Sequence, residues 1–270
     1  MPADLHHEVL GDPSARCLLL THGIYGSGAN WRGIARKVID RRPDWSIALV
    51  DLRSHGRSAD GTPPHTLASC AEDISALLDK QPTIVALAGH SFGGKVVLAA
   101  RGMVSRDLVQ TWMFDSSPSA RPGAETDRAN SVTRVLDIFM RLPKEWPSRD
   151  AFVQAVIAEG ETKPLAQWLA MNVIPSDGDG YVQRLDPAVM RLLLRDYYTQ
   201  DLWPVAEDAS LPGTLEVVIA AKSNTLDAED RRRLALGPPH IHTHTIDAGH
   251  WLHIEAPANV VELLVSRLPT

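Results

Sequence analysis

The sequence predicts an α/β fold in which helices cover both faces of a mostly parallel, twisted sheet. Short apolar runs typical of buried strands alternate with segments whose apolar residues recur at helical spacing, and this alternation is typical of parallel sheets. Several runs end in glycine-rich or polar loops, which collect at the carboxyl edge of such a sheet. With 270 residues, 44% of them hydrophobic and 22% charged, the chain can bury a large core.

Most of the chain keeps this alternation of strands and helices. Strands are expected at 16–21, 46–50, 83–88, 110–114, 215–220 and 240–246. Helices are expected at about 31–39, 66–80, 95–100, 227–236 and 258–268. The last strand carries its residues to the same edge as the others, so chemistry is expected at the loops that follow the strands.

The alternation breaks between residues 116 and 209. This stretch has proline-marked helical patterns near 125–140, 148–159, 163–171 and 187–198, and no convincing buried strand. We expect a helical lid inserted after the strand that ends at Asp115, with 1–115 and 210–270 forming the core domain. Six large apolar side chains either roof an acyl pocket or pack the lid's own small core: Phe139, Trp146, Trp168, Leu169, Met171 and Trp203.

The segment from Gly89 to Gly93 has the pattern Gly-x-Ser-x-Gly between an expected strand and an expected helix. A serine in such a sharp turn has a strained backbone, so only small residues fit two places before and two places after it. The strain also turns the hydroxyl outward. Ser91 is therefore the predicted nucleophile; the alternative is a glycine-rich loop with an incidental serine.

A serine hydroxyl is a poor nucleophile at neutral pH, so it needs a base and an acid that orients the base. His250 is the predicted base because it follows the last strand and completes the chain order serine, acid, histidine. His253 is the alternative, about one helical turn further on. We interpret His22, His55 and His90 as residues that pack loops.

Two aspartates are candidates for the acid. In the commonest arrangement the acid follows the penultimate strand, where this chain has Asn224, which carries no charge. Asp227 stands a little further on, but it is also a good cap for the helix that it begins. Asp115 lies at the tip of the strand after the Ser91 helix, from where a carboxylate can reach the same histidine. We therefore prefer Asp115 and keep Asp227 as the alternative.

The reaction also needs hydrogen-bond donors for the developing oxyanion. The amide of Phe92, which follows the nucleophile, is one expected donor. The amide of Ile24 is the other, because it lies in the loop after the first strand of the catalytic edge.

Three histidines, His240, His242 and His244, alternate along the last strand and therefore share one face. They resemble metal ligands superficially, but no carboxylate shares their spacing. We interpret this strand as an exposed edge strand of His and Thr, and we expect no metal site.

Composition excludes several classes of function. The formal charge is −6, from 27 basic and 33 acidic residues, and argues against a nucleic-acid-binding surface. Cys17 and Cys70 are expected to be buried thiols, which fits a reducing compartment. The first ten residues have no apolar stretch typical of a signal peptide, and no run has membrane-spanning length. A cytoplasmic protein is expected, and the sequence makes no prediction of its oligomeric state.

Four segments of this sequence resemble the α/β-hydrolase superfamily. They are His22-Gly23-Ile24-Tyr25-Gly26-Ser27, Asp51-Leu52-Arg53-Ser54-His55-Gly56-Arg57-Ser58, Gly89-His90-Ser91-Phe92-Gly93-Gly94-Lys95 and Gly249-His250-Trp251. More narrowly, the chain is similar to the YbfF-like esterases, which include mammalian abhydrolase domain-containing protein 11. Lys95 and the segment 167–172 favour this narrower resemblance, which spans nearly the whole chain. Where that group usually has Trp-Arg-x-Asn-Leu in its lid, this chain has residues 182–186, Val-Gln-Arg-Leu-Asp.

The resemblance implies a carboxylesterase-like serine hydrolase that needs no cofactor. It implies cleavage of small-molecule esters or thioesters with short to medium acyl groups, through an acyl-enzyme intermediate. It also implies an acid on the strand after the Ser91 helix, which supports Asp115. Two alternatives on the same fold are a non-hydrolytic or slow ligand-sensing protein and a perhydrolase or lyase that uses the same triad.

Overall fold

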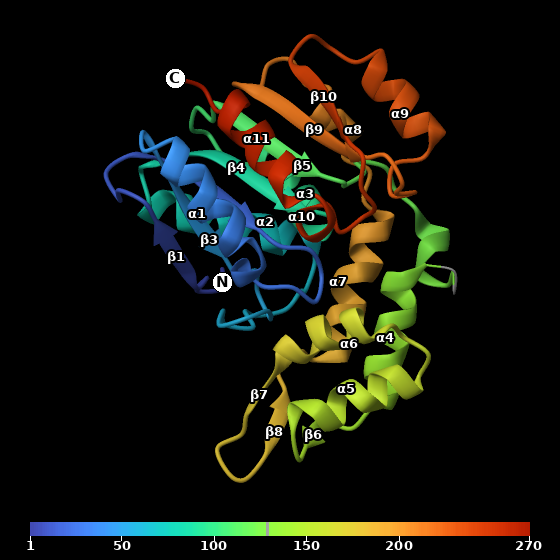
Figure 1. The fold of residues 1–270 in the computed structure, drawn as a ribbon. Coiled ribbons are helices and arrows are strands. Elements are labelled where there is room, and N and C mark those ends of the chain that lie inside the picture. Colours follow the sequence, from blue (N-terminus) through green and yellow to red (C-terminus); the bar gives the residue numbers. More distant parts are fainter. Residues whose placement is uncertain (128–129) are drawn as a thin grey trace.

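A seven-stranded sheet lies at the centre of the computed structural model, which describes residues 1–127 and 130–270 (Figure 1). The strand order is β1-β3-β2-β4-β5-β9-β10, with β1 antiparallel to β3 and all other pairs parallel. The strands are β1 (His7–Leu10), β2 (Arg16–Thr21), β3 (Trp45–Val50), β4 (Ile84–His90), β5 (Gln110–Phe114), β9 (Thr214–Ala220) and β10 (Ile241–Ile246). The predicted α/β fold with a mostly parallel sheet is confirmed.

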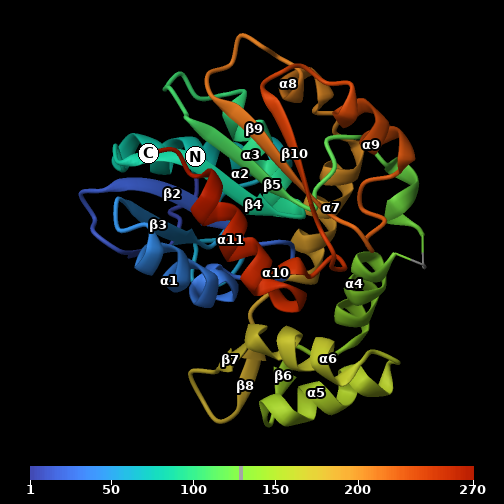
Figure 2. The ribbon, with the colours of Figure 1, turned by 45° about the horizontal axis from the view of Figure 1, so that its top comes forward.

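Helices cover both faces of this sheet (Figures 1 and 2). Helices α1 (Arg32–Arg41) and α11 (Pro257–Arg267) pack together on one face. The other face is covered by α2 (Leu67–Lys80), α3 (Phe92–Arg101) and α9 (Ala228–Ala235). The central strands are therefore buried on both sides, which explains why they are continuous apolar runs in the sequence.

The six predicted strands are present, each with boundaries within two residues of those expected. The additional strand, β1, has no apolar run, because it is an antiparallel edge strand whose residues are only half-buried or exposed. Cys17 and Cys70 are free and buried, as predicted. In the part of the chain that the structure describes, no helix is long and apolar enough to cross a bilayer.

Residues 116–209, here called the β5–β9 segment, leave the sheet after β5 and return to it at β9. They form a lobe beside the carboxyl edge of the sheet (Figures 1 and 2). Its elements are η2 (Pro122–Glu125), α4 (Ser131–Arg141), β6 (Glu145–Trp146), α5 (Arg149–Ala158), α6 (Lys163–Leu169), η3 (Ala170–Asn172), β7 (Val173–Pro175), β8 (Tyr181–Gln183), α7 (Pro187–Thr199) and α8 (Trp203–Ala206).

Two expectations for the β5–β9 segment need correction. First, the segment is not purely helical, because β6, β8 and β7 form a small antiparallel sheet. Strands of two or three residues are too short to produce a periodic pattern. Second, the helix expected at 125–140 begins only at Ser131, because the Asn130 side chain accepts a hydrogen bond from the amide of Val132 and caps it. Residues 128 and 129 of that expected helix lie outside the described residues.

A buried ion pair anchors the loop that follows β3. Arg53 and Asp73 are each only 1% exposed, and the guanidinium contacts both carboxylate oxygens, at 2.6 and 2.8 Å. Arg53 also donates to the carbonyl oxygens of Thr62, Pro64 and Ser69. The loop is thereby attached to α2. These bonds also fix the position of His55, two residues after Arg53 in the same loop.

We expect Arg53→Met to lower the free energy of unfolding by about 3–5 kcal/mol, because the Asp73 carboxylate would stay buried without its cation. Urea denaturation measures this change. The matched control is Arg41→Met, which breaks an exposed pair with Glu262 and should leave the free energy of unfolding nearly unchanged. If both substitutions lowered the free energy of unfolding equally, the stabilising role given to the buried Arg53–Asp73 pair would be contradicted.

Candidate active site

Ser91 lies in the turn between β4 and α3, and its backbone is in the left-handed region with φ of +51°. Its amide donates to the carbonyl oxygen of Phe114 at 2.9 Å, which attaches the turn to β5. A Cβ on Gly89 would collide with the backbone of Gly93, and a Cβ on Gly93 would collide with the carbonyl oxygen of His22. The predicted need for glycine on both sides of Ser91 therefore has a direct steric cause.

Three side chains from distant segments meet beside this turn. Oγ of Ser91 lies 3.1 Å from Nε2 of His250, and Nδ1 of His250 lies 2.7 Å from Oδ2 of Asp115. Asp115 follows β5 directly and is fully buried, whereas His250 follows β10 and its side chain is 21% exposed. Because Nδ1–H donates to the carboxylate, Nε2 has a free lone pair that can accept the serine proton. The structure brings the three predicted residues together.

Two hydroxyls that the sequence analysis missed lie beside the pair of Asp115 and His250. Its Oδ2 accepts a hydrogen bond from Ser223 at 2.6 Å, and its Oδ1 accepts one from the amide of Ala220 at 3.1 Å. Oγ1 of Thr225 lies 3.0 Å from Ser223 Oγ and 3.0 Å from Nδ1 of His250. The Ser223 hydroxyl and the Ala220 amide lower the cost of burying the Asp115 carboxylate. The turn after β9, where the acid commonly lies in such folds, therefore contributes two hydroxyls and no carboxylate to the surroundings of Asp115 and His250.

Asp227, the alternative acid, is not brought to His250. Its carboxylate accepts a hydrogen bond from the amide of Asp230 at 2.9 Å and so caps α9. The same carboxylate lies 3.2 Å from the guanidinium of Arg121 and is 57% exposed. The cap that its position in the sequence suggested is therefore present.

His253, the alternative base, lies in the short helix α10 (Leu252–Glu255) and stacks on Trp31 with ring centroids 4.9 Å apart. Burial lowers the pKa of His253 to about 4. His90 donates from Nε2 to the carbonyl oxygen of His250 at 2.8 Å, and burial holds the pKa of His90 well below its ordinary value. His90 therefore stays neutral and holds the loop of His250, in agreement with the loop-packing role predicted for it.

Two further histidines hold the loops around the site, as predicted. Nε2 of His22 accepts from the amide of Leu52 at 3.0 Å, and Nε2 of His55 accepts from the amide of Tyr25 at 3.3 Å. Burial lowers the pKa of His22 to about 4 and that of His55 to about 3. Both rings therefore remain neutral acceptors at physiological pH.

Ile24 and Phe92, the predicted oxyanion donors, line one cavity together with Ser91. Phe92 is the first residue of α3, so its amide is among those that have no partner within the helix. Ile24 lies in a tight turn that the amide of Gly26 closes by donating to Gly23 at 3.0 Å. The two predicted donors thus belong to the wall next to the nucleophile.

Two cavities meet at Ser91 and His250. The first, of about 40 Å³, is mostly apolar, and its walls include Val135, Leu165, Trp168, Leu169 and Trp251. The second, of about 250 Å³, is polar, and its walls include Arg121, Asn130, Tyr198, Asn224 and Thr225. Ser91 therefore has an apolar cavity on one side and a polar cavity on the other.

Only some of the six large apolar side chains of the β5–β9 segment reach this site. Trp168 and Leu169 line the apolar cavity, and Trp168 packs edge-on against Trp251 with ring centroids 4.6 Å apart. The other four lie elsewhere: Phe139 and Trp146 pack on Phe152, Met171 is exposed, and Trp203 packs in α8 against Arg233.

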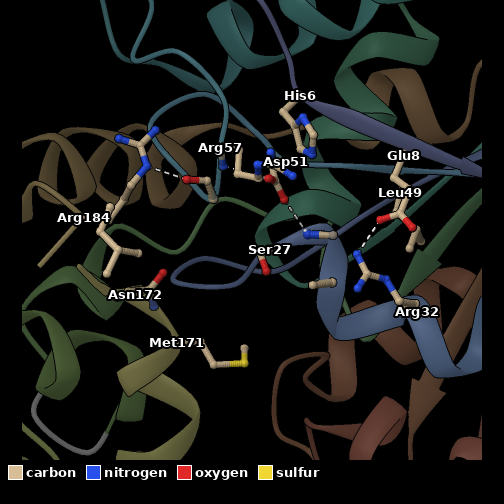
Figure 3. A pocket seen from close by; sticks show the side chains of 14 residues that line it. His6, Glu8, Ser27, Arg32, Leu49, Asp51, Arg57, Met171, Asn172 and Arg184 are labelled. Atoms are coloured by element: carbon tan, nitrogen blue, oxygen red, sulfur yellow. Dashed lines mark hydrogen bonds and ion pairs between the residues drawn. The ribbon is translucent and has the colours of Figure 1, made fainter. Parts of the chain in front are cut away.

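A separate cavity of about 190 Å³ lies between the β5–β9 segment and the loops after β2 and β3 (Figure 3). Several of its charged groups have partners, since Arg32 contacts Glu8 and Asp51 accepts from the amide of Gly28 at 2.7 Å. It shares no lining residue with the two cavities at Ser91.

The histidines of β10 have a partner that the sequence analysis did not find. Glu216 of β9 is buried and accepts from His242 at 2.9 Å and from His244 at 2.7 Å. The register of the two strands places His242 beside Glu216, a pairing that spacing along one strand cannot reveal. Among the described residues, no group of three or more potential ligands could hold a metal ion.

Comparisons with known proteins give one consistent result. The model of the alpha/beta hydrolase family matches residues 18–263. The sn-1-specific diacylglycerol lipase ABHD11 of Mus musculus is 22% identical, over 99% of this chain and 86% of that protein. A probable alcohol acetyltransferase of Saccharomyces cerevisiae is 23% identical, over 98% of this chain and 83% of that protein. The solved structure of a marine microorganism esterase has a TM-score of 0.85 and 20% identity, over 98% of this chain and 100% of that chain.

The geometry predicts unequal effects for the two candidate acids. Asp115→Asn should slow the covalent labelling of Ser91 by a fluorophosphonate by a factor on the order of 10³, because an amide can hold His250 in the wrong tautomer. Asp227→Asn, the matched control, should leave the labelling rate within about twofold of wild type, because asparagine also caps a helix and the substitution weakens only a half-exposed ion pair with Arg121. A quenched time course measures the labelling rates. If Asp227→Asn slowed labelling more than Asp115→Asn, Asp227 and not Asp115 would be the acid.

Proposed function

Because this chain belongs to the alpha/beta hydrolase family, we propose that it hydrolyses carboxylic esters with Ser91 as the nucleophile. His250 is the general base and acid, and Asp115 orients it. The observation that carries this proposal is the continuous set of contacts from Ser91 through His250 to a buried carboxylate, at 3.1 and 2.7 Å. The similarity to a diacylglycerol lipase and to an esterase supports an ester as the substrate.

In the proposed reaction, Oγ of Ser91 attacks the ester carbonyl carbon while Nε2 of His250 takes the hydroxyl proton. The amides of Ile24 and Phe92 stabilise the oxyanion of the tetrahedral intermediate. The bond to the leaving alcohol then breaks as His250 returns the proton to that oxygen, leaving an acyl-enzyme. Water attacks the acyl-enzyme, gives a proton to His250 and releases the acid, and the proton returns to Ser91. A thioester would react by the same steps with a thiol as the leaving group.

The two cavities support a division of the substrate between them. We assign the apolar cavity to the acyl group, because Trp168, Leu169 and Trp251 offer it no strong polar partner. The larger polar cavity, with Asn224 and Thr225 beside His250, is assigned to the leaving alcohol. The small volume of the apolar side favours short to medium acyl groups.

We assign residues 116–209 to a lid over a core formed by 1–115 and 210–270. Both cavities at Ser91 have walls from the sheet loops and from this segment, which supports the assignment. A substrate in either cavity would therefore be partly covered, and water would be partly excluded from the reacting carbonyl.

Ser91→Ala should abolish the hydrolysis of p-nitrophenyl acetate and butyrate, because no other nucleophile takes part in the proposed reaction. The release of p-nitrophenol measures turnover, and fluorophosphonate labelling of the wild-type protein reports that Ser91 is reactive. Activity retained by the variant would overturn the assignment of the nucleophile. Labelling without turnover of any ester in a panel of acyl chains would favour a ligand-sensing protein.

Trp168→Ala should move the preference of the enzyme toward longer acyl chains, because the substitution removes part of the wall of the apolar cavity. The measurement is kcat/KM for p-nitrophenyl esters from two to twelve carbons. The control is Met171→Ala, which lies in the same segment, is exposed, and should leave the chain-length profile unchanged. A second panel keeps the acyl group constant and varies the alcohol. If Trp168→Ala changed kcat/KM across that panel and not across the acyl panel, the assignment of the two cavities would be reversed.

A further inference from the structure

Tyr25 follows the oxyanion donor Ile24 and has a strained backbone. Its φ is +65°, a value that is a genuine outlier for a bulky residue and that favours glycine at this place in a turn. The turn is closed by the bond from the Gly26 amide to Gly23, so Ile24 and Tyr25 are its two central residues. Relaxation of Tyr25 to negative φ would reorient the turn that carries the Ile24 amide, so surrounding contacts must hold it.

Most of the contacts that hold Tyr25 come from the β5–β9 segment. Nδ2 of Asn172, in η3, donates to the carbonyl oxygen of Tyr25 at 2.8 Å. The hydroxyl of Tyr25 donates to the carbonyl oxygen of Val132 in α4 at 3.0 Å, and its ring packs edge-on against Phe139 at 5.4 Å. From the sheet side, the amide of Tyr25 donates to Nε2 of His55 at 3.3 Å. The strained turn is therefore fixed largely by a segment that lies more than one hundred residues away in sequence.

Asn172 is itself held firmly. It is 6% exposed, and its side chain also donates to the carbonyl oxygen of Leu169 at 3.3 Å. Its own carbonyl oxygen accepts from the amide of Arg184 at 2.8 Å. The guanidinium of Arg184, labelled in Figure 3, in turn donates to the carbonyl oxygens of Gly56 and Ser58, in the loop after β3. Asn172 thus lies at a junction where the β5–β9 segment is fastened to the core.

We propose that Asn172 is a positioning residue for the oxyanion hole, because its bond to Tyr25 holds the turn that presents the Ile24 amide to the substrate. The oxyanion hole is then complete only when the β5–β9 segment is packed against the core. This inference rests on the proposed ester hydrolysis. It adds to that reaction a residue that does not touch the reacting atoms and lies outside the cavities at Ser91.

The bond should matter in the transition state more than in substrate binding. Negative charge develops on the carbonyl oxygen only as Ser91 attacks, so a displaced Ile24 amide weakens the transition state selectively. Complete loss of one such donor costs a factor of about 10²–10³ in kcat, and a displaced donor should cost less. The expected signature is a lower kcat with nearly constant KM.

The test compares Asn172→Asp with wild type on p-nitrophenyl acetate. Aspartate has nearly the same shape as asparagine, but its carboxylate cannot donate to the Tyr25 carbonyl oxygen and repels it. We expect kcat to fall by about tenfold or more, KM to change by less than about twofold, and the pH dependence of kcat/KM to keep its midpoint because the contacts of His250 are unchanged. The thermal midpoint is recorded alongside.

Two further variants keep the test decisive. Arg149→Met is the control, because Arg149 donates at 2.6 Å to Val173, the neighbour of Asn172, without touching the Tyr25 turn, and kcat should stay near wild type. Tyr25→Phe removes only the bond to Val132 and should lower kcat in the same direction, whether or not Asn172→Asp folds. If wild type hydrolyses no ester, the proposed function itself is overturned. If wild type is active and both Asn172→Asp and Tyr25→Phe keep its kcat, or if Arg149→Met lowers kcat equally, this inference alone is overturned.

Discussion

The parallel register between β4 and β5 is the constraint on which the site depends. His90 pairs with Phe114, and Ser91 and Asp115 are the residues that follow them directly. Nucleophile and carboxylate therefore leave neighbouring strands at the same level. The amide of Ser91 continues the pairing by donating to Phe114, and the amide of Asp115 donates to Val218 of the next strand at 2.7 Å. Both residues have positive φ, and these sheet bonds hold the strained turns in place.

The proposed chemistry of the site requires a charged group that water does not reach. Asp115 is fully buried, and its carboxylate is stabilised by Ala220, Ser223 and His250. Each donor removes part of the cost of burying the carboxylate and also fixes its direction. A carboxylate held in this way keeps the proton of His250 on Nδ1, and Nε2 is then always the nitrogen that faces Ser91. The hydroxyls of the β9 turn are therefore part of the geometry of the proposed triad.

The β5–β9 segment contributes both cavity walls and contacts that hold other parts of the site. It supplies part of the walls of both cavities at Ser91, and through Asn172 and Val132 it holds the strained turn at Tyr25. Lys95 makes a further connection from α3, one helical turn after Ser91, because its buried ammonium donates to the carbonyl oxygens of Ser119 and Tyr197 at 2.8 and 2.9 Å. Burial lowers the pKa of Lys95 to about 8. Helix α3, which follows the proposed nucleophile, and the turn at Tyr25 are thus both attached to the same segment.

The sequence by itself determined the alternation of buried strands and helices and the glycines around Ser91, because these depend on local sterics and on periodic burial. It also limited the acid to Asp115 or Asp227. Only the tertiary structure decided which carboxylate meets His250, because that depends on strand register and not on spacing along the chain. The hydrogen bonds of Ser223 and Thr225 at the site and the bond from Asn172 to Tyr25 were decided in the same way. No periodic pattern in the sequence indicates these contacts, so only the folded structure shows that the groups lie within hydrogen-bonding distance.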